Sequence, residues 1–379
     1  MKPHPFPTPT RSILPGAPPR GPARRRAALA VAVAAFLTAA ACSSEESSSG
    51  DDADEGSDAS GEVVRLITYD AYALPEQAVE AFEEQSGATV EVVATGDSGT
   101  MLAKALLSAG APEGDVIFGI DNTTAAEAAS EPLLEQYRPE AASALDVALA
   151  PPGVVADSLT PIDTSEVCVN VDASWFADND LDLPETFDDL ADPSYAGLLS
   201  VQSPVSSSPG MAFLLGTVET YGEDGWIDYW GRLAANDVRV SPSWDDAYYG
   251  DYTVSGGDRP MVVSYASSPP AEVVFSEGER TEPASVVMDD TCVTQVEYAG
   301  VLAGAEHPEL ARELLDFMLS EEWQRGLPLS NFVYPVTDVE LPEEFARWAP
   351  RPEQPVVVDV DAVATSRDDW VERWREAME

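Results

Sequence analysis

Apolar and polar positions alternate along residues 63–119 in a way that predicts strands and helices in turn. Residues 63–69, 88–93 and 115–119 are short, mostly apolar runs rich in β-branched side chains, which are typical of strands. Residues 75–86 and 99–110 lie between them and have apolar side chains at helical spacing. This β-α-β-α-β order with short connections predicts parallel strands covered by helices, and therefore an α/β fold.

The remainder of the chain continues the same mixture. Further strands are expected at residues 166–170, 198–201 and 260–265, and helices are expected to begin near residues 186, 211 and 307.

Polar and aromatic side chains follow the strands predicted in the first part of the chain. Tyr69, Asp97 and Asp121 each stand at or just after a strand end. Because ligands of parallel sheets bind beyond the carboxyl ends of the strands, we expect these side chains to meet in one crevice. The serine-rich turn 206–210 precedes a helix, where free backbone N–H groups favour a polar ligand or simply start the helix.

The first residues have the pattern of an export signal. Arg24, Arg25 and Arg26 precede the uncharged run 27–41, which is shorter than the roughly 20 residues that a membrane-spanning helix needs. Small residues then lead directly to Cys42, as in a bacterial lipobox. We expect residues 1–42 to be a lipoprotein signal peptide and Cys42 to carry acyl chains. An ordinary signal peptide with a chance cysteine is the alternative, and the choice between Sec and twin-arginine export stays open.

Residues 43–61 contain Ser, Asp, Glu and Gly, with Ala as the only apolar type. Such a composition cannot bury a core, so we expect a disordered acidic tether between the lipid and a folded unit that starts near Val63.

Size and charge restrict the functions open to the chain. Its 379 residues, 44% of them hydrophobic, are enough for about two domains. Acidic residues number 68 against 20 Lys plus Arg, which gives a formal charge of -48. A surface this negative repels phosphate backbones, so nucleic-acid binding is excluded.

The cysteines fit an exported protein. If Cys42 is lipidated, Cys168 and Cys292 remain in a compartment that permits disulfides, and we predict that they pair. Two buried free thiols are the alternative.

The residues needed for catalysis are scarce. Of two histidines, His4 lies in the expected leader and His307 stands where a helix begins, so a nucleophile would lack a base. Walker and Rossmann glycine loops are also absent from the sequence. We therefore expect no enzyme activity, no metal site and no cofactor.

Aromatic and acidic residues at predicted element ends suggest a site for a cation instead. Aromatic faces attract cations, and carboxylates add charge pairing. Any one of these aromatic residues alone is more often part of a core, but their joint position favours a site. The residues are Tyr69, Asp70, Tyr72, Asp97, Asp121, Trp244, Tyr248, Tyr249, Tyr265, Phe332 and Tyr334.

From about Val63 to its end, the chain resembles the extracytoplasmic solute-binding proteins of ABC importers, in particular the thiamine-binding proteins. The segments that carry the resemblance are Thr68-Tyr69-Asp70, Gly119-Ile120-Asp121-Asn122, Ser208-Pro209-Gly210, Trp244-Asp245-Asp246-Ala247-Tyr248, Ser264-Tyr265-Ala266-Ser267-Ser268-Pro269, Gln295-Val296-Glu297, Asn331-Phe332-Val333-Tyr334-Pro335-Val336 and Trp370-Val371-Glu372-Arg373-Trp374.

The resemblance implies a two-lobed, periplasmic-binding-protein-like fold of type II with a ligand cleft between the lobes. We expect residues 62–166 and 293–379 to form the first lobe with the C-terminal helices, and residues 167–292 to form the second. It further implies a monomer that delivers its ligand to an ABC permease at the outer face of the cytoplasmic membrane.

The same resemblance implies a ligand, thiamine or a thiamine phosphate, and a set of ligand-binding residues. Tyr69, Trp244 and Tyr265 would contact the rings, and Asp97 and Asp121 would face the thiazolium charge or the aminopyrimidine. Ser207 would face the hydroxyethyl or phosphate end, and Phe332 stands where the family often has Trp.

Three alternatives stay open at this point. Tyr248-Tyr249 is similar to the adjacent tyrosines of ferric-binding proteins, which have the same fold and suit a hard cation. Another organic cation, such as a polyamine, is the second alternative, and a secreted enzyme is the third.

Overall fold

Residues 61–378 are described by a computed structural model, and they belong to one compact unit. The expected leader 1–42, with Cys42, and residues 43–60 of the expected tether lie outside the described residues. Within the described range, no helix is both long and apolar enough to cross a membrane.

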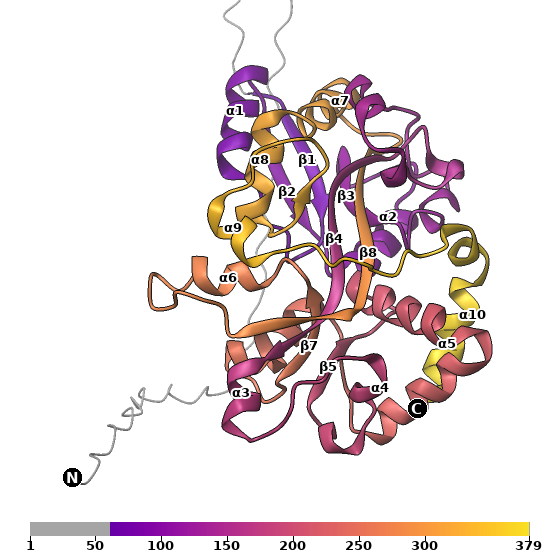
Figure 1. The fold of residues 1–379 in the computed structure, drawn as a ribbon. Coiled ribbons are helices and arrows are strands. Elements are labelled where there is room, and N and C mark those ends of the chain that lie inside the picture. The colour runs from indigo at the N-terminus through magenta and orange to yellow at the C-terminus, as the bar shows by residue number, and fades with distance from the viewer. Residues whose placement is uncertain (1–60, 379) are drawn as a thin grey trace, which may run out of the picture. The chain divides into compact units, whose positions relative to one another are not determined.

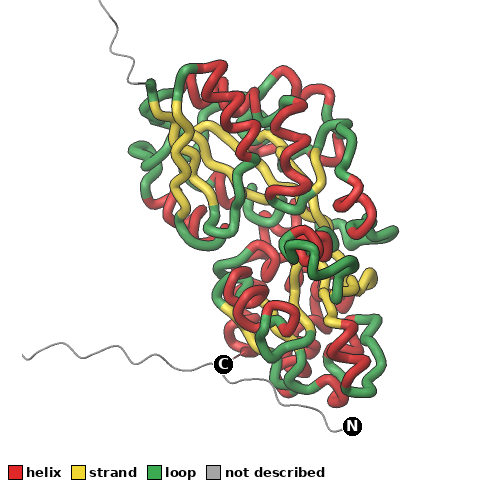
Figure 2. The backbone as a smooth tube through the Cα atoms, turned by 90° about the vertical axis from the view of Figure 1, so that its left-hand side faces the viewer, coloured by secondary structure: helices red, strands yellow, loops and turns green. Residues whose placement is uncertain are grey.

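One mixed sheet runs through this unit, with helices packed on it (Figures 1 and 2). The strands are β1 (Val63–Thr68), β2 (Thr89–Ala94), β3 (Val116–Asp121), β4 (Thr160–Asp172), β5 (Leu199–Gln202), β6 (Arg239–Ser241), β7 (Met261–Tyr265), β8 (Ser285–Val301) and β9 (Tyr334–Pro335). The α-helices are α1 (Glu76–Ser86), α2 (Ser98–Leu107), α3 (Ala173–Asp178), α4 (Phe187–Leu190), α5 (Ser208–Ala235), α6 (Pro269–Val274), α7 (Pro308–Phe317), α8 (Glu321–Ser330), α9 (Glu343–Trp348) and α10 (Val360–Met378).

The order of the strands in the sheet is β2-β1-β3-β8-β4-β7-β5-β6, with β9 paired to β4. Strand β1 is parallel to both β2 and β3, which confirms the predicted β-α-β-α-β unit. A second parallel group follows, because β5 is parallel to both β6 and β7.

Helices cover both faces of the first parallel group. Leu66 and Phe118 belong to a core shared with α1, α7 and α8, whereas Ile67 and Ile117 belong to a core shared with α2. Successive residues of a strand point to opposite faces, so both faces of β1 and β3 are largely buried, whereas the edge strand β2 is mostly exposed.

The two parallel groups are joined by a long antiparallel ladder of β4 and β8. The pairing runs from Thr160 opposite Ala299 to Asp172 opposite Ser285, with register shifts between Pro161 and Asp163 and between Val167 and Val169. Strand β8 was not predicted, because polar residues such as Asp289 interrupt its apolar pattern. The ladder connects two lobes: the first contains the two cores just described, and the second has a core of its own that includes Val201 and Val263.

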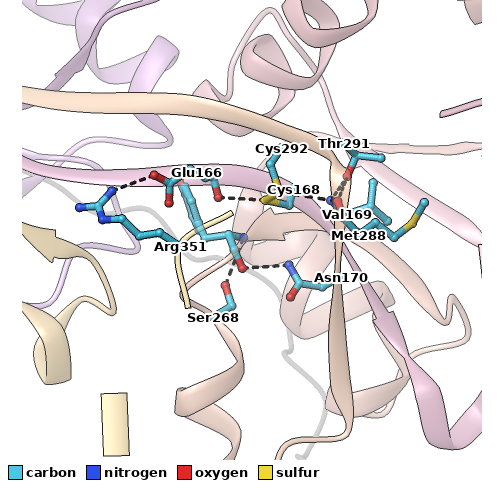
Figure 3. The surroundings of a disulfide bond; sticks show 10 residues. Glu166, Cys168, Val169, Asn170, Ser268, Met288, Thr291, Cys292 and Arg351 are labelled. Carbon is cyan, nitrogen blue, oxygen red and sulfur yellow. Dashed lines mark hydrogen bonds and ion pairs between the residues drawn. A yellow bond between two sulfur atoms is a disulfide. The ribbon is translucent and has the colours of Figure 1, made fainter. Parts of the chain in front are cut away.

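Cys168 and Cys292 form a disulfide across this ladder, as predicted, with Cα atoms 4.2 Å apart. Figure 3 shows the polar contacts around it, among them those of Glu166, Asn170 and Thr291. There the Asn170 side chain donates a hydrogen bond to the Tyr265 carbonyl over 3.0 Å. The disulfide thus lies next to the backbone that positions one of the predicted ligand-binding aromatic residues.

The last helix, α10, packs against the hydrophobic core of the second lobe. Trp370, Val371 and Trp374 of α10 are buried there against α5, and the rings of Trp230 and Trp374 meet edge-on at 5.7 Å. Residues 293–379, which were expected in the first lobe, therefore contribute to both lobes. The expected lobe boundaries remain a prediction.

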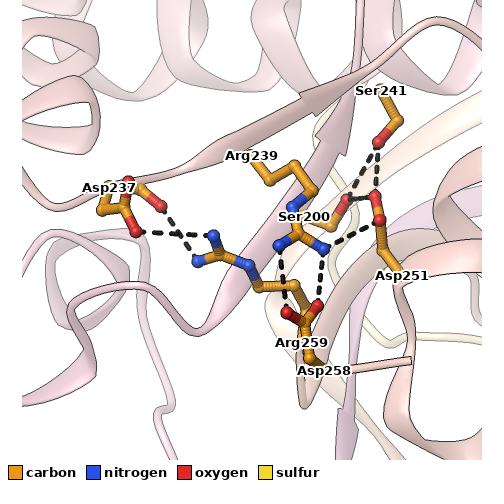
Figure 4. A network of polar contacts seen from close by, with 7 residues as sticks. All are labelled: Ser200, Asp237, Arg239, Ser241, Asp251, Asp258 and Arg259. Carbon is orange, nitrogen blue, oxygen red and sulfur yellow. Dashed lines mark hydrogen bonds and ion pairs between the residues drawn. The ribbon is translucent and has the colours of Figure 1, made fainter. Parts of the chain in front are cut away.

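A polar network supports the turn that follows β6 (Figure 4). Asp251 accepts hydrogen bonds from Ser200 over 2.8 Å and Ser241 over 2.5 Å, and from Arg239 over 2.9 Å. Arg239 also contacts Asp258 over 2.5 Å. Because Asp251 ends the π-helical turn Asp246–Asp251, the network anchors that turn to β5 and β6.

Candidate functional site

A cavity of about 900 Å³, including space open to solvent, lies where the segments predicted at the crevice converge. It is lined mainly by aromatic, small and polar side chains. The lining residues are Tyr69, Ala71, Ala73, Asp97, Ser98, Ser208, Pro209, Trp244, Tyr248, Tyr249, Tyr265, Ser268, Ala271, Phe275, Glu297, Ser330, Asn331, Phe332 and Val333.

Trp244 forms one wall of the cavity and is held firmly. Its ring stacks on Tyr248, with ring centres 4.7 Å apart and planes 15° from parallel. Its indole N–H donates to Ser264 Oγ over 3.0 Å. Tyr265 completes this wall, with its ring 6.3 Å from that of Trp244. The indole face is therefore pre-oriented for stacking on a flat ligand.

Tyr69 also lines the cavity and comes immediately after β1. Its hydroxyl donates to Glu297 over 3.1 Å and accepts from Asn331 over 3.1 Å. Gly119 on β3 has a φ of 102°, and a Cβ there would meet the Tyr69 ring at 2.5 Å. Glycine at this position thus lets the ring lie against the strand.

Phe332 lies at the edge of the cavity and has a φ of 52°, which is unusual for a bulky residue. Its ring meets Phe275 edge-on at 5.4 Å. Phe275 itself is 65% exposed, so these two rings form an apolar rim open to solvent.

Asp97 joins two of the segments around the cavity. It caps α2 by accepting from the backbone N–H of Ser98 over 2.7 Å, and its other oxygen accepts from the N–H of Trp244 over 2.9 Å. Burial raises the pKa of Asp97, while these hydrogen bonds oppose the rise. The carboxyl group therefore fixes Trp244 relative to α2 and adds negative potential to the cavity.

Two residues of the ligand-binding set that the resemblance implies are not among the lining residues, and of the other candidate residues Asp70, Tyr72 and Tyr334 are not either. Asp121 is fully buried at the end of β3, where it accepts hydrogen bonds from Thr123, Thr124 and Gln295. Ser207 is buried at the start of α5, one residue before Ser208, which does reach the cavity. These hydrogen bonds hold the Asp121 carboxylate inside the protein. Ser207 stands just before the first residue of α5, and its side chain does not line the cavity.

Several lining residues had no predicted role. Glu297 belongs to a segment that resembled the family, yet its place at the cavity depends on the β3–β8–β4 pairing, which the sequence did not reveal. Asn331 also had no role, although it stands beside Phe332. Tyr248 was among the candidate residues for a cation site, but the resemblance gave it no contact with the ligand.

The cavity is electrostatically negative. Of its lining residues, Asp97 and Glu297 carry carboxyl groups and none is Lys, Arg or His. Asp245 follows Trp244, and burial, together with nearby carboxylates, raises its pKa. Aromatic faces and carboxyl groups without basic partners suit an organic cation.

The two adjacent tyrosines have different surroundings. Tyr248 is buried against Trp244, whereas Tyr249 is 58% exposed. Burial raises the pKa of both phenols, which disfavours the ionised form that a ferric ion needs. Within residues 61–378, no three His, Cys, Asp or Glu side chains are grouped to hold a metal ion.

Comparison with known proteins identifies relatives over most of the chain. The profile of the family described as bacterial extracellular solute-binding protein matches residues 67–325. A thiamine-binding periplasmic protein of Salmonella typhimurium (strain LT2) is 29% identical over 320 residues, covering 83% of this chain and 93% of that protein.

Solved structures agree with the fold. A periplasmic thiamin binding protein is 25% identical, with a TM-score of 0.74, over 84% of this chain and 97% of that one. Iron-bound HitA from Pseudomonas aeruginosa is 19% identical, with a TM-score of 0.64, over 83% of this chain and 99% of that one. The latter similarity concerns the fold alone.

Proposed function

Because the chain belongs to the family of bacterial extracellular solute-binding proteins, which bind solutes and are not enzymes, we propose that its ligand is thiamine or a thiamine phosphate. The observation that carries the proposal is the cavity itself: Trp244, Tyr265 and Tyr69 surround a space with carboxyl groups and no basic side chain. Thiamine is a cation with two flat aromatic rings, so it matches both properties. The similarity to thiamine-binding proteins supports the same ligand.

In this proposal the aromatic residues sandwich the rings, with Phe332 at the rim. Asp97 supplies a nearby carboxyl group. Direct contact by Asp121 and Ser207 remains a prediction, which Asp121→Asn and Ser207→Ala would test by a loss of affinity in calorimetry.

The proposal is tested by identifying what the purified protein carries. Mass spectrometry of ligand released from the full-length protein should find thiamine or its phosphate, and calorimetry should then give a saturable one-to-one titration with added thiamine. Bound iron without an organic cation, measured by metal analysis of the same sample, would support the ferric alternative. A polyamine in place of thiamine would keep the site but change its ligand.

We also propose that the protein is a monomeric lipoprotein, anchored through Cys42 to the outer face of the cytoplasmic membrane, where it delivers its ligand to an ABC permease. A diacylated or triacylated cysteine provides the two or more chains that stable anchoring needs.

Cys42→Ala should release the protein from the membrane into the soluble fraction. Immunoblots of fractionated cells would show this shift, with wild type as the control. A Cys42→Ala variant that stays with the membrane would contradict the anchor.

A further inference from the structure

Two buried carboxyl groups lie opposite each other in the long β4–β8 ladder, beside the cavity. Asp163 pairs with Glu297 in the register of the two strands. Asp163 is 0% exposed and Glu297 is 4% exposed, yet Glu297 also lines the cavity. The pair therefore connects the strand ladder between the lobes with the ligand site.

Among the described residues, no Lys, Arg or His side chain forms an ion pair with either carboxyl group. The Asp163 oxygens accept no hydrogen bond from a neutral or cationic donor, and the only side-chain contact that affects the pKa of Asp163 is with the Glu297 carboxyl group. Glu297 accepts a hydrogen bond from the Tyr69 hydroxyl. The other titratable groups that face the pair are Asp121 on β3, Tyr72 after β1 and Tyr265 on β7, and none of these can carry a positive charge.

Glu166 provides a contrast on the same strand. It lies three residues beyond Asp163 on β4 and is also buried, but its carboxylate contacts the Arg351 guanidinium over 2.8 Å. A buried carboxylate with a cation at this distance can remain charged, whereas one without a cation favours the protonated form.

The protonation of the pair follows from this environment. Burial raises the pKa of Asp163 to about 8, and burial followed by the charge of Asp163 raises the pKa of Glu297 well above its ordinary value. Two neighbouring carboxyl groups in a low dielectric do not both ionise. At neutral pH the empty site therefore holds at least one proton on this pair.

We propose that the Asp163–Glu297 pair acts as a proton-linked counter-ion, which keeps its proton while the cleft is empty and releases it when an organic cation binds. The inference rests on the proposed function. In this step a carboxyl O–H bond breaks, the proton passes to solvent, and the electron pair stays on the Glu297 oxygen that faces the ligand. The positive charge of the ligand thus replaces the charge of the proton.

This exchange makes ligand binding depend on pH in one direction. At low pH the cation must compete with the bound proton, so affinity is weak. Affinity then rises with pH, by up to about tenfold per pH unit for one released proton, and levels off above the pKa of the empty pair. The range to examine is about pH 6 to 8, which ends near the raised pKa of Asp163.

Calorimetric titration with thiamine in buffers of different ionisation enthalpy counts the protons released on binding. For the full-length protein at about pH 7 we expect close to one proton per thiamine. Glu297→Gln should bind thiamine more weakly, release no proton and lose the pH dependence. Asp163→Asn, as a second variant, should release fewer protons than wild type, because it removes the charge that adds to burial in raising the Glu297 pKa. Circular dichroism would show that both variants are folded.

Glu166→Gln is the matched control, because it removes a buried carboxylate from the same ladder away from the cavity lining. It should release protons as wild type does. Thiamine binding without proton release, or equal release by Glu297→Gln, would overturn this inference and leave the proposed function intact. Absence of thiamine binding by wild type at every pH would overturn both.

Discussion

Trp244 is positioned by three neighbours: Asp97 holds its backbone, Ser264 its indole N–H, and Tyr248 one face of its ring. Trp244→Ala should therefore remove stacking and cation-π attraction together, about 2–3 kcal/mol, or a roughly 30- to 150-fold weaker Kd for thiamine. Calorimetry measures the change, and Trp244→Phe, which keeps a ring, should lose less. An unchanged Kd in Trp244→Ala would rule out the proposed sandwich.

Tyr249→Phe removes one hydroxyl group and thereby distinguishes a thiamine site from a ferric site. The Tyr249 ring is largely exposed, so losing its hydroxyl should change thiamine affinity by less than about twofold, as is usual for surface substitutions. A ferric site would lose a ligand. Titration of this variant with thiamine and with ferric citrate compares the two, and a large loss of thiamine affinity alone would place Tyr249 in the organic site.

Gly119→Ala tests how closely Tyr69 is fitted to β3. The new Cβ would meet the Tyr69 ring at 2.5 Å, and the φ of 102° is unfavourable for alanine. We expect a loss of about 1–3 kcal/mol in the free energy of unfolding, measured by denaturant titration, with weaker thiamine binding. Gly153→Ala, where a Cβ would meet nothing within 4 Å, is the control and should stay near wild type. Equal stability of the two variants would contradict this account.

Tyr69, Trp244 and Tyr265 were predicted to lie at the site because each stands at or near the end of a predicted strand or in a turn, and all three line the cavity. The same rule placed Asp121 there too, but the hydroxyls of the threonines that follow it satisfy its carboxylate inside the protein. Glu297 escaped prediction because its location depends on strand register, which is a long-range property.

Among the structural elements, the π-helical turn Asp246–Asp251 depends on the carboxylate at its end. Asp251→Asn would weaken its contacts with Arg239, Ser200 and Ser241, and should lower the free energy of unfolding by about 1–3 kcal/mol. It should also weaken thiamine binding, since the turn carries Tyr248 beneath Trp244.

The matched control for this turn is Asp258→Asn. Asp258 contacts the same Arg239, but its side chain is 72% exposed, so we expect a loss below about 1 kcal/mol. Denaturant titrations and calorimetry of the two variants give the comparison. A greater loss for Asp258→Asn would mean that the exposed ion pair, and not the buried hydroxyl contacts, holds the turn.

The elements near the N-terminal edge of the sheet were predictable because their patterns are local. Strands β1, β2 and β3 are short apolar runs between helices of regular spacing. Strand β8 gave no such signal, because its 17 residues include the polar stretch 289–291 and are held mainly by pairing with β3 and β4. Propensity gives way to tertiary pairing in such a strand.

For the whole molecule, the disulfide is the strongest single constraint on the unfolded chain. It joins residues separated by 124 positions, which is worth about 4–5 kcal/mol in the chain-entropy model. Cys168→Ser with Cys292→Ser should lower the free energy of unfolding by about that amount, measured by denaturant titration. Wild type treated with reductant is the control, and should approach the double variant. Free thiols in non-reducing peptide maps of oxidised wild type would contradict the pairing.

The cross-linked ladder also determines what kind of motion the lobes can make. Strands β4 and β8 are bonded covalently at Cys168 and Cys292, so they cannot slide past each other without breaking that bond. We therefore expect relative movement of the lobes to come from bending and twisting of the sheet on either side of this bond. Such bending would leave the strand register unchanged, so Tyr265, whose carbonyl accepts a hydrogen bond from Asn170 beside the disulfide, would keep its place on the wall of the cavity as the lobes move.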